Sequence, residues 1–282
     1  MNALEIKGLC KRYSGFSLED VSFTLPMGTI TGLVGRNGAG KTTTLKSILG
    51  TIHPDSGEIQ IFGKPRSREA MQEVGIVYDE CCFSEVLTLR QINSVLNSVY
   101  HNWSSDLFYG MCERYGLPGN KKIKTFSRGM KQKLSIAAAM AHSPKLLLLD
   151  EPTGGLDPVA RNEILDDLWE FIEDGMHTVL LSTHITTDLD RIADRIIILS
   201  GGRIQIDENK DTLLEDYGIL KGSPEQLSMV DKSDILGLRK STYFFEALCK
   251  DRVQMAKKYP ALTCDRTDIE QMLVLMEGGA EG

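Results

Sequence analysis

The sequence contains no long hydrophobic run. No apolar stretch approaches the ~18–20 residues that a membrane-spanning helix requires. The first residues, MNALEIKGLCKRY, also lack the apolar segment of a secretory signal peptide. We therefore expect a cytoplasmic protein that reaches a membrane only through a partner.

Cysteine pairs with C-x-x-C spacing and an excess of basic residues are lacking as well. The six cysteines of the 282-residue chain show no C-x-x-C spacing, which favours reduced thiols over a disulfide framework. Lysine and arginine number 32 against 39 aspartates and glutamates, so the formal net charge is −7. This acidic balance argues against a general nucleic-acid binder, and we expect no nucleic-acid partner.

Short apolar runs alternate with longer segments of helical periodicity along most of the chain. Hydrophobic residues make up 41% of the sequence, as in an average globular protein, so a substantial core can form. Continuous apolar runs are typical of strands buried on both faces of a parallel sheet, and four occur, at residues 30–34, 146–149, 179–181 and 196–199. Residues 158–172 have an apolar helical face, with Asp157 as the expected N-cap and Gly175 as the stop.

Three other regions differ from this alternating pattern. Residues 3–30 alternate in β fashion, which predicts an antiparallel edge, and residues 84–142 are mostly helical. After residue 207 the alternation of apolar runs and helical segments ends, so we expect a first domain over 1–207 and an extension over 208–282. Capping boxes that begin at Ser223 and Thr267 predict that this extension is ordered, with two further helix starts.

A glycine-rich motif follows the first apolar run and precedes a helix-like segment. It fits G-x-x-x-x-G-K-[ST], whose glycines let backbone N–H groups surround phosphate oxygens at a helix N-terminus. A chance glycine-rich turn is the alternative. The expected nucleotide-binding residues are Gly35, Arg36, Asn37, Gly38, Ala39, Gly40, Lys41, Thr42 and Thr43. Lys41 would reach the outer phosphates of ATP, and the Thr42 hydroxyl would bind Mg²⁺.

Two carboxylates end the apolar run at residues 146–149. Because side chains alternate along a strand, Asp150 and Glu151 should point in different directions. Asp150 suits Mg²⁺ binding, and Glu151 suits activation of the attacking water. Together these features predict an α/β P-loop NTPase fold: a mostly parallel core sheet, an antiparallel β edge, a helical subdomain over about 84–142, and a C-terminal α+β extension.

The order of five motifs resembles the ATP-binding subunits of ABC transporters. They are GRNGAGKT (35–42), FSRGMKQ (126–132), LLLLDEP (146–152), GGLDP (154–158) and STH (182–184), and the resemblance covers about residues 3–207. The SxGMKQ form of the second motif is similar to the subfamily that pairs with drug, antibiotic or antimicrobial-peptide export permeases.

This resemblance implies roles for further residues. Ser127 and Gly129 would contact the γ-phosphate of ATP bound to the opposite subunit, and Asp157 would lie at the seam between two subunits. Ser127 can also cap a helix that runs through Gln132 to Ala141, which would aim the helix dipole at an anion. His184 would hydrogen-bond the γ-phosphate and join Glu151 as a catalytic residue. Tyr13 would stack on adenine; an ordinary strand-end tyrosine is the alternative, with Phe16 as the substitute ring.

The chain departs from the family pattern at several positions. Asp79 stands where the family usually has glutamine, and it could bind Mg²⁺, directly or through water. A third carboxylate beside Asp150 and Glu151 would bring repulsion, so we expect slow turnover or a need for the permease. In the FSRGMKQ motif, Phe126, Arg128 and Met130 replace leucine, glycine and glutamine.

The motifs together predict an ATPase with Mg²⁺ that powers a membrane exporter. Two nucleotide-binding subunits, as a homodimer or as this chain with a close paralogue, would sandwich two ATP molecules. A transmembrane permease would hold the pair at the inner face of the cell membrane. One alternative is a non-transport ABC protein in DNA repair or translation control. Another is a soluble nucleotide-binding regulator with little hydrolysis. The cargo is not encoded in this chain.

Overall fold

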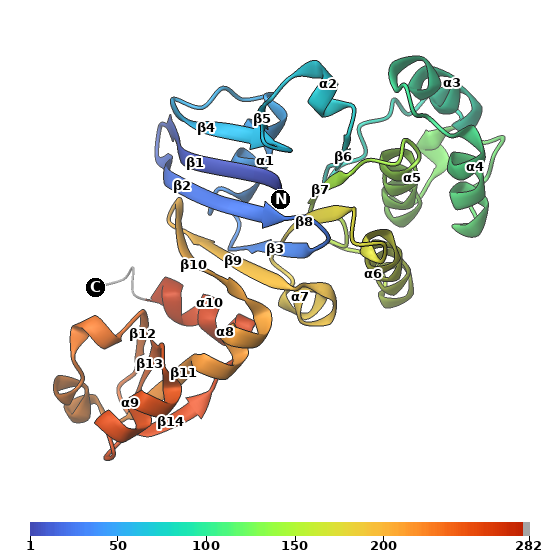
Figure 1. Cartoon of the computed structure of the whole chain (residues 1–282). Helices are drawn as coiled ribbons and strands as arrows, with labels where there is room; N and C mark the ends of the chain where they lie inside the picture. The colour runs from blue at the N-terminus through green and yellow to red at the C-terminus, as the bar shows by residue number, and fades with distance from the viewer. Residues whose placement is uncertain (279–282) are drawn as a thin grey trace.

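The computed structural model describes residues 1–278, and Figure 1 shows three β-sheets with helices packed around them. The central sheet has six strands in the order β10-β9-β3-β8-β7-β6. Every residue of β3, β7 and β8 is buried, so the expected mostly parallel core is confirmed. The parallel strands are β3 (Ile30–Val34), β6 (Val74–Val77), β7 (Leu146–Asp150), β8 (Thr178–Thr183) and β9 (Arg195–Ser200); β10 (Arg203–Asn209) pairs antiparallel with β9.

The N-terminal antiparallel strands form a separate sheet that covers one face of the central sheet. Its order is β2-β1-β4-β5, and it contains β1 (Asn2–Tyr13), β2 (Phe16–Pro26), β4 (Ser56–Ile61) and β5 (Lys64–Pro65). Helix α1 (Lys41–Leu49) packs with it, because Leu45 and Ile48 share one apolar cluster with Ile6 of β1 and Leu148 of β7. The chain then passes through the short helix α2 (Arg68–Met71) into β6.

Helices α6 (Pro158–Ile172) and α7 (Thr186–Ile192) pack against the opposite face of the central sheet. The bounds of α6 match the prediction. The Asp157 carboxylate accepts hydrogen bonds from the N–H groups of Val159 and Ala160, both at 3.0 Å, and Pro158 occupies the first turn. At the other end the Gly175 N–H donates to the Ile172 carbonyl at 2.9 Å.

The helical insertion lies beside the β6–β7 edge of the central sheet (Figure 1). It contains α3 (Leu89–Val99), α4 (Ser105–Arg114) and α5 (Arg128–Met140), which surround the fully buried Phe108. A capping box between Thr88 and Gln91 starts α3. Neither here nor elsewhere in residues 1–278 is any helix both long enough and apolar enough to cross a membrane.

The C-terminal segment builds a third, antiparallel sheet and then returns to the core. Helix α8 (Lys210–Asp216) leads to the sheet of order β12-β13-β11-β14. The last helix, α10 (Ile269–Gly278), places Met272 and Leu275 in the same apolar cluster as Ile196 of β9. The remaining elements are β11 (Gly218–Gly222), β12 (Gly237–Lys240), β13 (Phe245–Cys249), α9 (Arg252–Lys258) and β14 (Thr263–Arg266).

Both predicted helix starts in this segment need correction. The Ser223 box is present, with the Ser223 N–H donating to Gln226 Oε1 at 2.8 Å, but it opens a 3₁₀ helix over Pro224–Met229. Thr267 does not cap the last helix. Asp268 is one residue closer to α10, and its carboxylate accepts the Gln271 N–H at 2.7 Å.

A buried histidine ties the helical insertion to the central sheet. His142, which follows α5, lies within 3.3 Å of the Val74 carbonyl on β6 and stacks on the Tyr100 ring, with 4.0 Å between ring centroids. Burial lowers the pKa of His142 below its ordinary value of 6.5. The unfolded chain therefore binds a proton at a higher pH than the folded protein does, and stability should fall as the pH drops through 6.5.

Replacing this histidine should reduce that pH dependence. In the wild type, the free energy of unfolding in urea should decrease between pH 7.5 and pH 5.5. His142→Gln should lower the free energy of unfolding at pH 7.5. Between pH 7.5 and pH 5.5, however, the free energy of unfolding of this variant should decrease measurably less than that of the wild type. The exposed His53 offers a matched control, since His53→Gln should leave the decrease unchanged. An equal pH dependence in the wild type and His142→Gln would contradict the account.

Candidate functional site

The glycine-rich loop joins β3 to α1, and its backbone packs closely against the end of β9. Gly38 and Gly40 have φ angles of 86° and 114°, in the region that favours glycine. A side chain on Gly35 would begin only 2.2 Å from the Leu199 carbonyl oxygen of β9. Helix α1 begins with no side chain capping its N-terminal amides and no acidic residue in its first turn. This end of the helix is therefore suited to an anion such as phosphate.

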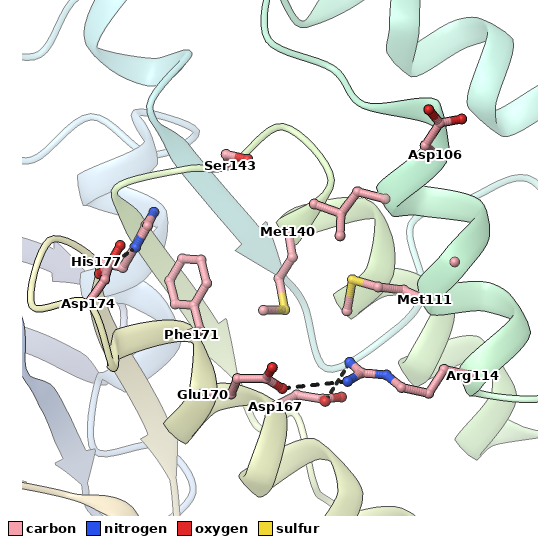
Figure 2. Close-up of a pocket in the computed structure, with 12 residues that line it drawn as sticks. Asp106, Met111, Arg114, Met140, Ser143, Asp167, Glu170, Phe171, Asp174 and His177 are labelled. Carbon is pink, nitrogen blue, oxygen red and sulfur yellow. Dashed lines mark hydrogen bonds and ion pairs between the residues drawn. The ribbon is translucent and has the colours of Figure 1, made fainter.

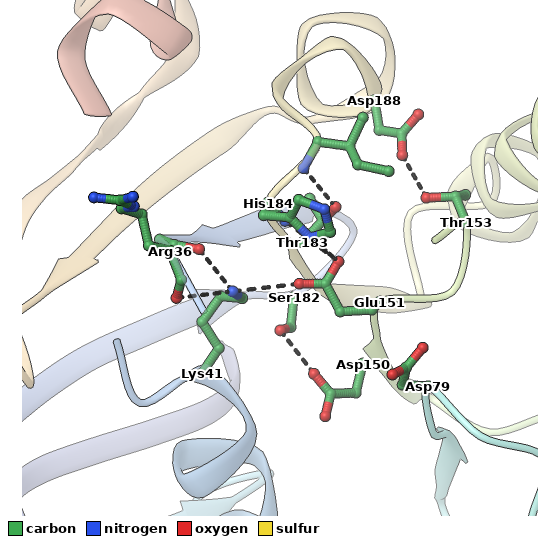
Figure 3. A network of polar contacts seen from close by, with 12 residues as sticks. Arg36, Lys41, Asp79, Asp150, Glu151, Thr153, Ser182, Thr183, His184 and Asp188 are labelled. Atoms are coloured by element: carbon green, nitrogen blue, oxygen red, sulfur yellow. Dashed lines mark hydrogen bonds and ion pairs between the residues drawn. The ribbon is translucent and has the colours of Figure 1, made fainter. Parts of the chain in front are cut away.

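Lys41 is buried beneath this loop. Its Nζ donates to the Gly35 carbonyl at 2.6 Å and lies 3.4 Å from the Arg36 carbonyl. Glu151 Oε1 lies 3.3 Å from the same ammonium (Figure 3). A buried charge requires such partners, and a phosphate anion entering the loop would offer a stronger one.

Asp150 ends β7 with both carboxylate oxygens engaged. Thr42 Oγ1 donates to Oδ2 at 2.8 Å, and Ser182 Oγ, from the neighbouring β8, donates to Oδ1 at 2.9 Å. The predicted pair of Thr42 and Asp150 is thus brought together. A hydroxyl and a carboxylate at this distance, beside a phosphate loop, fit Mg²⁺. The sequence analysis placed Ser182 in the STH motif but gave it no role, although its position at the end of a strand was the available signal.

Glu151 turns away from Asp150, as strand alternation predicts. Its φ of 49° is left-handed, and strained backbone of this kind collects at functional sites. The side chain faces Lys41 on one side and His184 on the other, with Glu151 Oε2 lying 2.8 Å from His184 Nδ1 and 3.3 Å from the His184 backbone nitrogen. The predicted catalytic pair is therefore in contact, and the imidazole remains half exposed.

Asp79 makes a different contact from the one expected. It follows β6 near Asp150 (Figure 3), yet its Oδ1 pairs with Arg128 Nη2 at 3.1 Å. Within residues 1–278, no group of three or more His, Cys, Asp or Glu side chains is arranged to hold a metal ion. The structure thus gives Asp79 a cationic partner, and its role as a magnesium ligand stays a prediction.

The residues expected to serve a second subunit lie at exposed helix starts. Ser127 caps α5 by accepting the Met130 N–H at 3.2 Å, which confirms the predicted cap. Gly129 borders Leu156, since a side chain there would begin 3.7 Å from Leu156 Cδ2. Asp157 caps α6, and the hydrogen bond from the Ala160 N–H keeps the pKa of this carboxyl below its usual range. No hydrogen bond or ion pair links these three residues to their own phosphate loop within the described chain.

A hollow of about 460 Å³ lies at the turn between β1 and β2, lined in part by Tyr13 and Phe16. The two rings stack with centroids 6.5 Å apart, and Tyr13 is 45% exposed. Phe16 reaches the phosphate loop, because a side chain on Gly40 would begin 3.0 Å from its ring. A flat base could therefore stack here beside the loop.

A larger hollow, of about 510 Å³, lies between α4 and α6 (Figure 2). Arg114 reaches across it to Asp167 at 2.6 Å and Glu170 at 3.6 Å. The Tyr115 hydroxyl also donates to Asp167, whose pKa is raised by burial. None of the predicted site residues lines this hollow, so we assign it to the packing of the helical insertion.

Two polar contacts at the site were missed by the sequence analysis. Arg36 of the loop pairs with Glu277 of α10 at 3.1 Å, so the extension reaches the phosphate loop. The fully buried Asp188 of α7 accepts hydrogen bonds from Thr153 and Arg161, both at 2.5 Å. This second network fixes the segment after Glu151 against the helix after His184, and no local signal pointed to it.

Lys41 offers a direct test of this geometry. Lys41→Ala removes the ammonium that we expect to meet the outer phosphates, so ATP affinity should fall at least tenfold by fluorescent-nucleotide titration. Lys46→Ala, in the last turn of the same helix, is the matched control and should bind as the wild type does. Equal affinity of Lys41→Ala and the wild type would show that the nucleotide does not occupy this loop.

Comparison with known proteins agrees with the geometry. The sequence pattern of the ABC transporter family matches residues 18–154. The uncharacterized ABC transporter ATP-binding protein YdbJ of Bacillus subtilis is 36% identical over 208 residues, or 72% of this chain and 68% of that protein. The lantibiotic transport ATP-binding protein SrtF of Streptococcus pyogenes is 34% identical over 74% of this chain and 91% of its own.

A solved structure described as the ATP-binding subunit of an ABC transporter is 31% identical and superposes with a TM-score of 0.68, covering 75% of this chain and 91% of that one. The fold is thus shared with such subunits. In this chain it brings together the phosphate loop, the acidic end of β7 and His184, which follows β8. The chain therefore belongs to the ABC transporter family, as an ATP-binding subunit.

Proposed function

We propose that this subunit hydrolyses ATP with Mg²⁺ and so powers a membrane exporter. The observation that carries the proposal is that Lys41 contacts Glu151, and Thr42 contacts Asp150, beside one phosphate loop. SrtF, whose name assigns it to lantibiotic transport, supports export of a peptide-like or antibiotic cargo. We assign the ATPase to residues 1–207, although β10 runs on to Asn209, and the extension to 208–282.

The residues of the site divide the chemistry among them. The loop amides and Lys41 hold the outer phosphates, which draws Lys41 away from Glu151 and leaves that carboxylate free to accept a proton from water. Thr42 and Asp150 would hold Mg²⁺, which when bound neutralises phosphate charge. Glu151 holds His184 through the imidazole Nδ1, which leaves the imidazole Nε2 available to the γ-phosphate.

A second copy of the chain would complete the site. Ser127 and Gly129 lie at the start of α5, where the positive end of the helix dipole can meet an anion, and the exposed Asp157 lies at the start of α6. In the proposed pair, each phosphate loop faces these residues of the other subunit. ATP then stabilises the closed pair because it binds that state more tightly than the open one.

A permease would hold this pair at the inner face of the cell membrane. A hollow of about 700 Å³ between α2 and α3 supports this assignment, because it adjoins the helical insertion and β6, which leads to Asp79. The exposed Val99 lines it together with charged residues, a mixture suited to a short amphipathic loop of a partner. The lining residues are Arg68, Glu69, Gln72, Glu73, Ser98, Val99, His101 and Asn102.

The proposal predicts hydrolysis that depends on pairing. With Mg²⁺ and ATP, the rate of the purified chain should rise faster than linearly with protein concentration. Glu151→Gln should reduce the rate about 100-fold or more, because it removes the general base, while leaving ATP affinity in place.

The alternative is a nucleotide-binding regulator, which Asp79 in place of glutamine favours. It predicts a negligible rate both alone and with the membrane partner. A rate that stays negligible in membranes containing the permease, with intact ATP binding, would contradict the transport ATPase and support the regulator.

A further inference from the structure

Two residues that depart from the family pattern lie in contact with each other. Asp79 replaces the usual glutamine after β6, and Arg128 replaces the usual glycine at the start of α5. Arg128 Nη2 lies 3.1 Å from Asp79 Oδ1, although 49 residues separate them in the sequence. The two departures are therefore one structural feature.

Arg128 also reaches the segment that follows Glu151. A side chain on Gly155 would begin 3.0 Å from Arg128 Nη1, and Gly155 has a φ of 69°. The guanidinium thus lies between the loop after β6 and the loop after β7. Its charge is held beside the site, next to Ser127, rather than directed away from the protein.

The ion pair is accessible to an incoming anion. The side chains of Arg128 and Asp79 are 62% and 51% exposed. Exposed ion pairs contribute little net stability, whereas a guanidinium binds phosphate with two parallel hydrogen bonds. A terminal phosphate arriving at Ser127 would therefore compete well with the single carboxylate for Arg128.

We propose that Arg128 is a phosphate-binding residue that exchanges Asp79 for the terminal phosphate of ATP on the partner subunit. The inference rests on the proposed two-subunit ATPase. Without nucleotide, Asp79 holds the guanidinium in place. When two subunits close on ATP, Arg128 moves to the phosphate, and each site gains a positive charge that a glycine could not supply. Asp79 is then a competitor for Arg128 and weakens closure.

The proposed exchange and a simple structural ion pair predict different effects of two substitutions on ATP-driven pairing. If the pair only braces the fold, Asp79→Asn and Arg128→Gly break the same contact and should act alike. If Arg128 exchanges partners, Arg128→Gly should weaken ATP-driven pairing and Asp79→Asn should strengthen it.

The test measures the dissociation constant of the ATP-bound pair by sedimentation, in the Glu151→Gln background that retains ATP. Arg128→Gly should raise the constant about tenfold or more, as expected for loss of a charge-assisted contact. Arg128→Gly should also make this dissociation constant less dependent on salt concentration, while binding of ATP to the single subunit stays unchanged. Asp79→Asn should lower the dissociation constant of the pair.

The matched control is Lys131→Gln, which breaks the neighbouring ion pair of Lys131 with Glu85, 2.7 Å long. This variant should leave the dissociation constant of the pair unchanged.

The outcomes separate the two proposals. Changes of the same sign in Arg128→Gly and Asp79→Asn, or no change in either, would overturn the exchange while leaving the two-subunit ATPase standing. Failure of the Glu151→Gln parent to pair at any ATP concentration would instead overturn the proposed function, and the exchange with it.

Discussion

The site depends on the burial of one ammonium group. Lys41 Nζ is enclosed by the loop that begins at Gly35 and is held by backbone carbonyls and by Glu151. Because a buried charge is costly without partners, this contact fixes the loop over the ends of β3 and β7. The close approach of Gly35 to the Leu199 carbonyl leaves no room for a side chain at position 35. The position of each phosphate-binding group follows from this constraint.

The remaining charges are arranged so that each carboxylate has its own partner. Asp150 takes two hydroxyl donors, Glu151 takes Lys41 and His184, and Asp79 takes Arg128. The repulsion expected from a third carboxylate is thereby relieved within a single chain. ATP would replace several of these contacts at once, so its binding would change the arrangement of the charged side chains at the site.

Local rules predicted most of the fold but not the contacts between distant segments. Apolar runs located the strands, and side-chain caps located α5 and α6, because these features depend on neighbours in sequence. Local rules also placed a cap at Thr267, one residue too early. The pairs of Arg36 with Glu277 and of Asp79 with Arg128 join segments brought together only by the tertiary fold, and no spacing pattern encodes them. The Asp188 network was missed for the same reason.

The central claim is that this ATP site is built to be shared by two subunits. Sedimentation of the Glu151→Gln protein with and without Mg²⁺ and ATP tests it most directly. The account predicts a single subunit without nucleotide or with ADP, and a pair with ATP. A protein that binds ATP yet stays a single subunit at all accessible concentrations would contradict it.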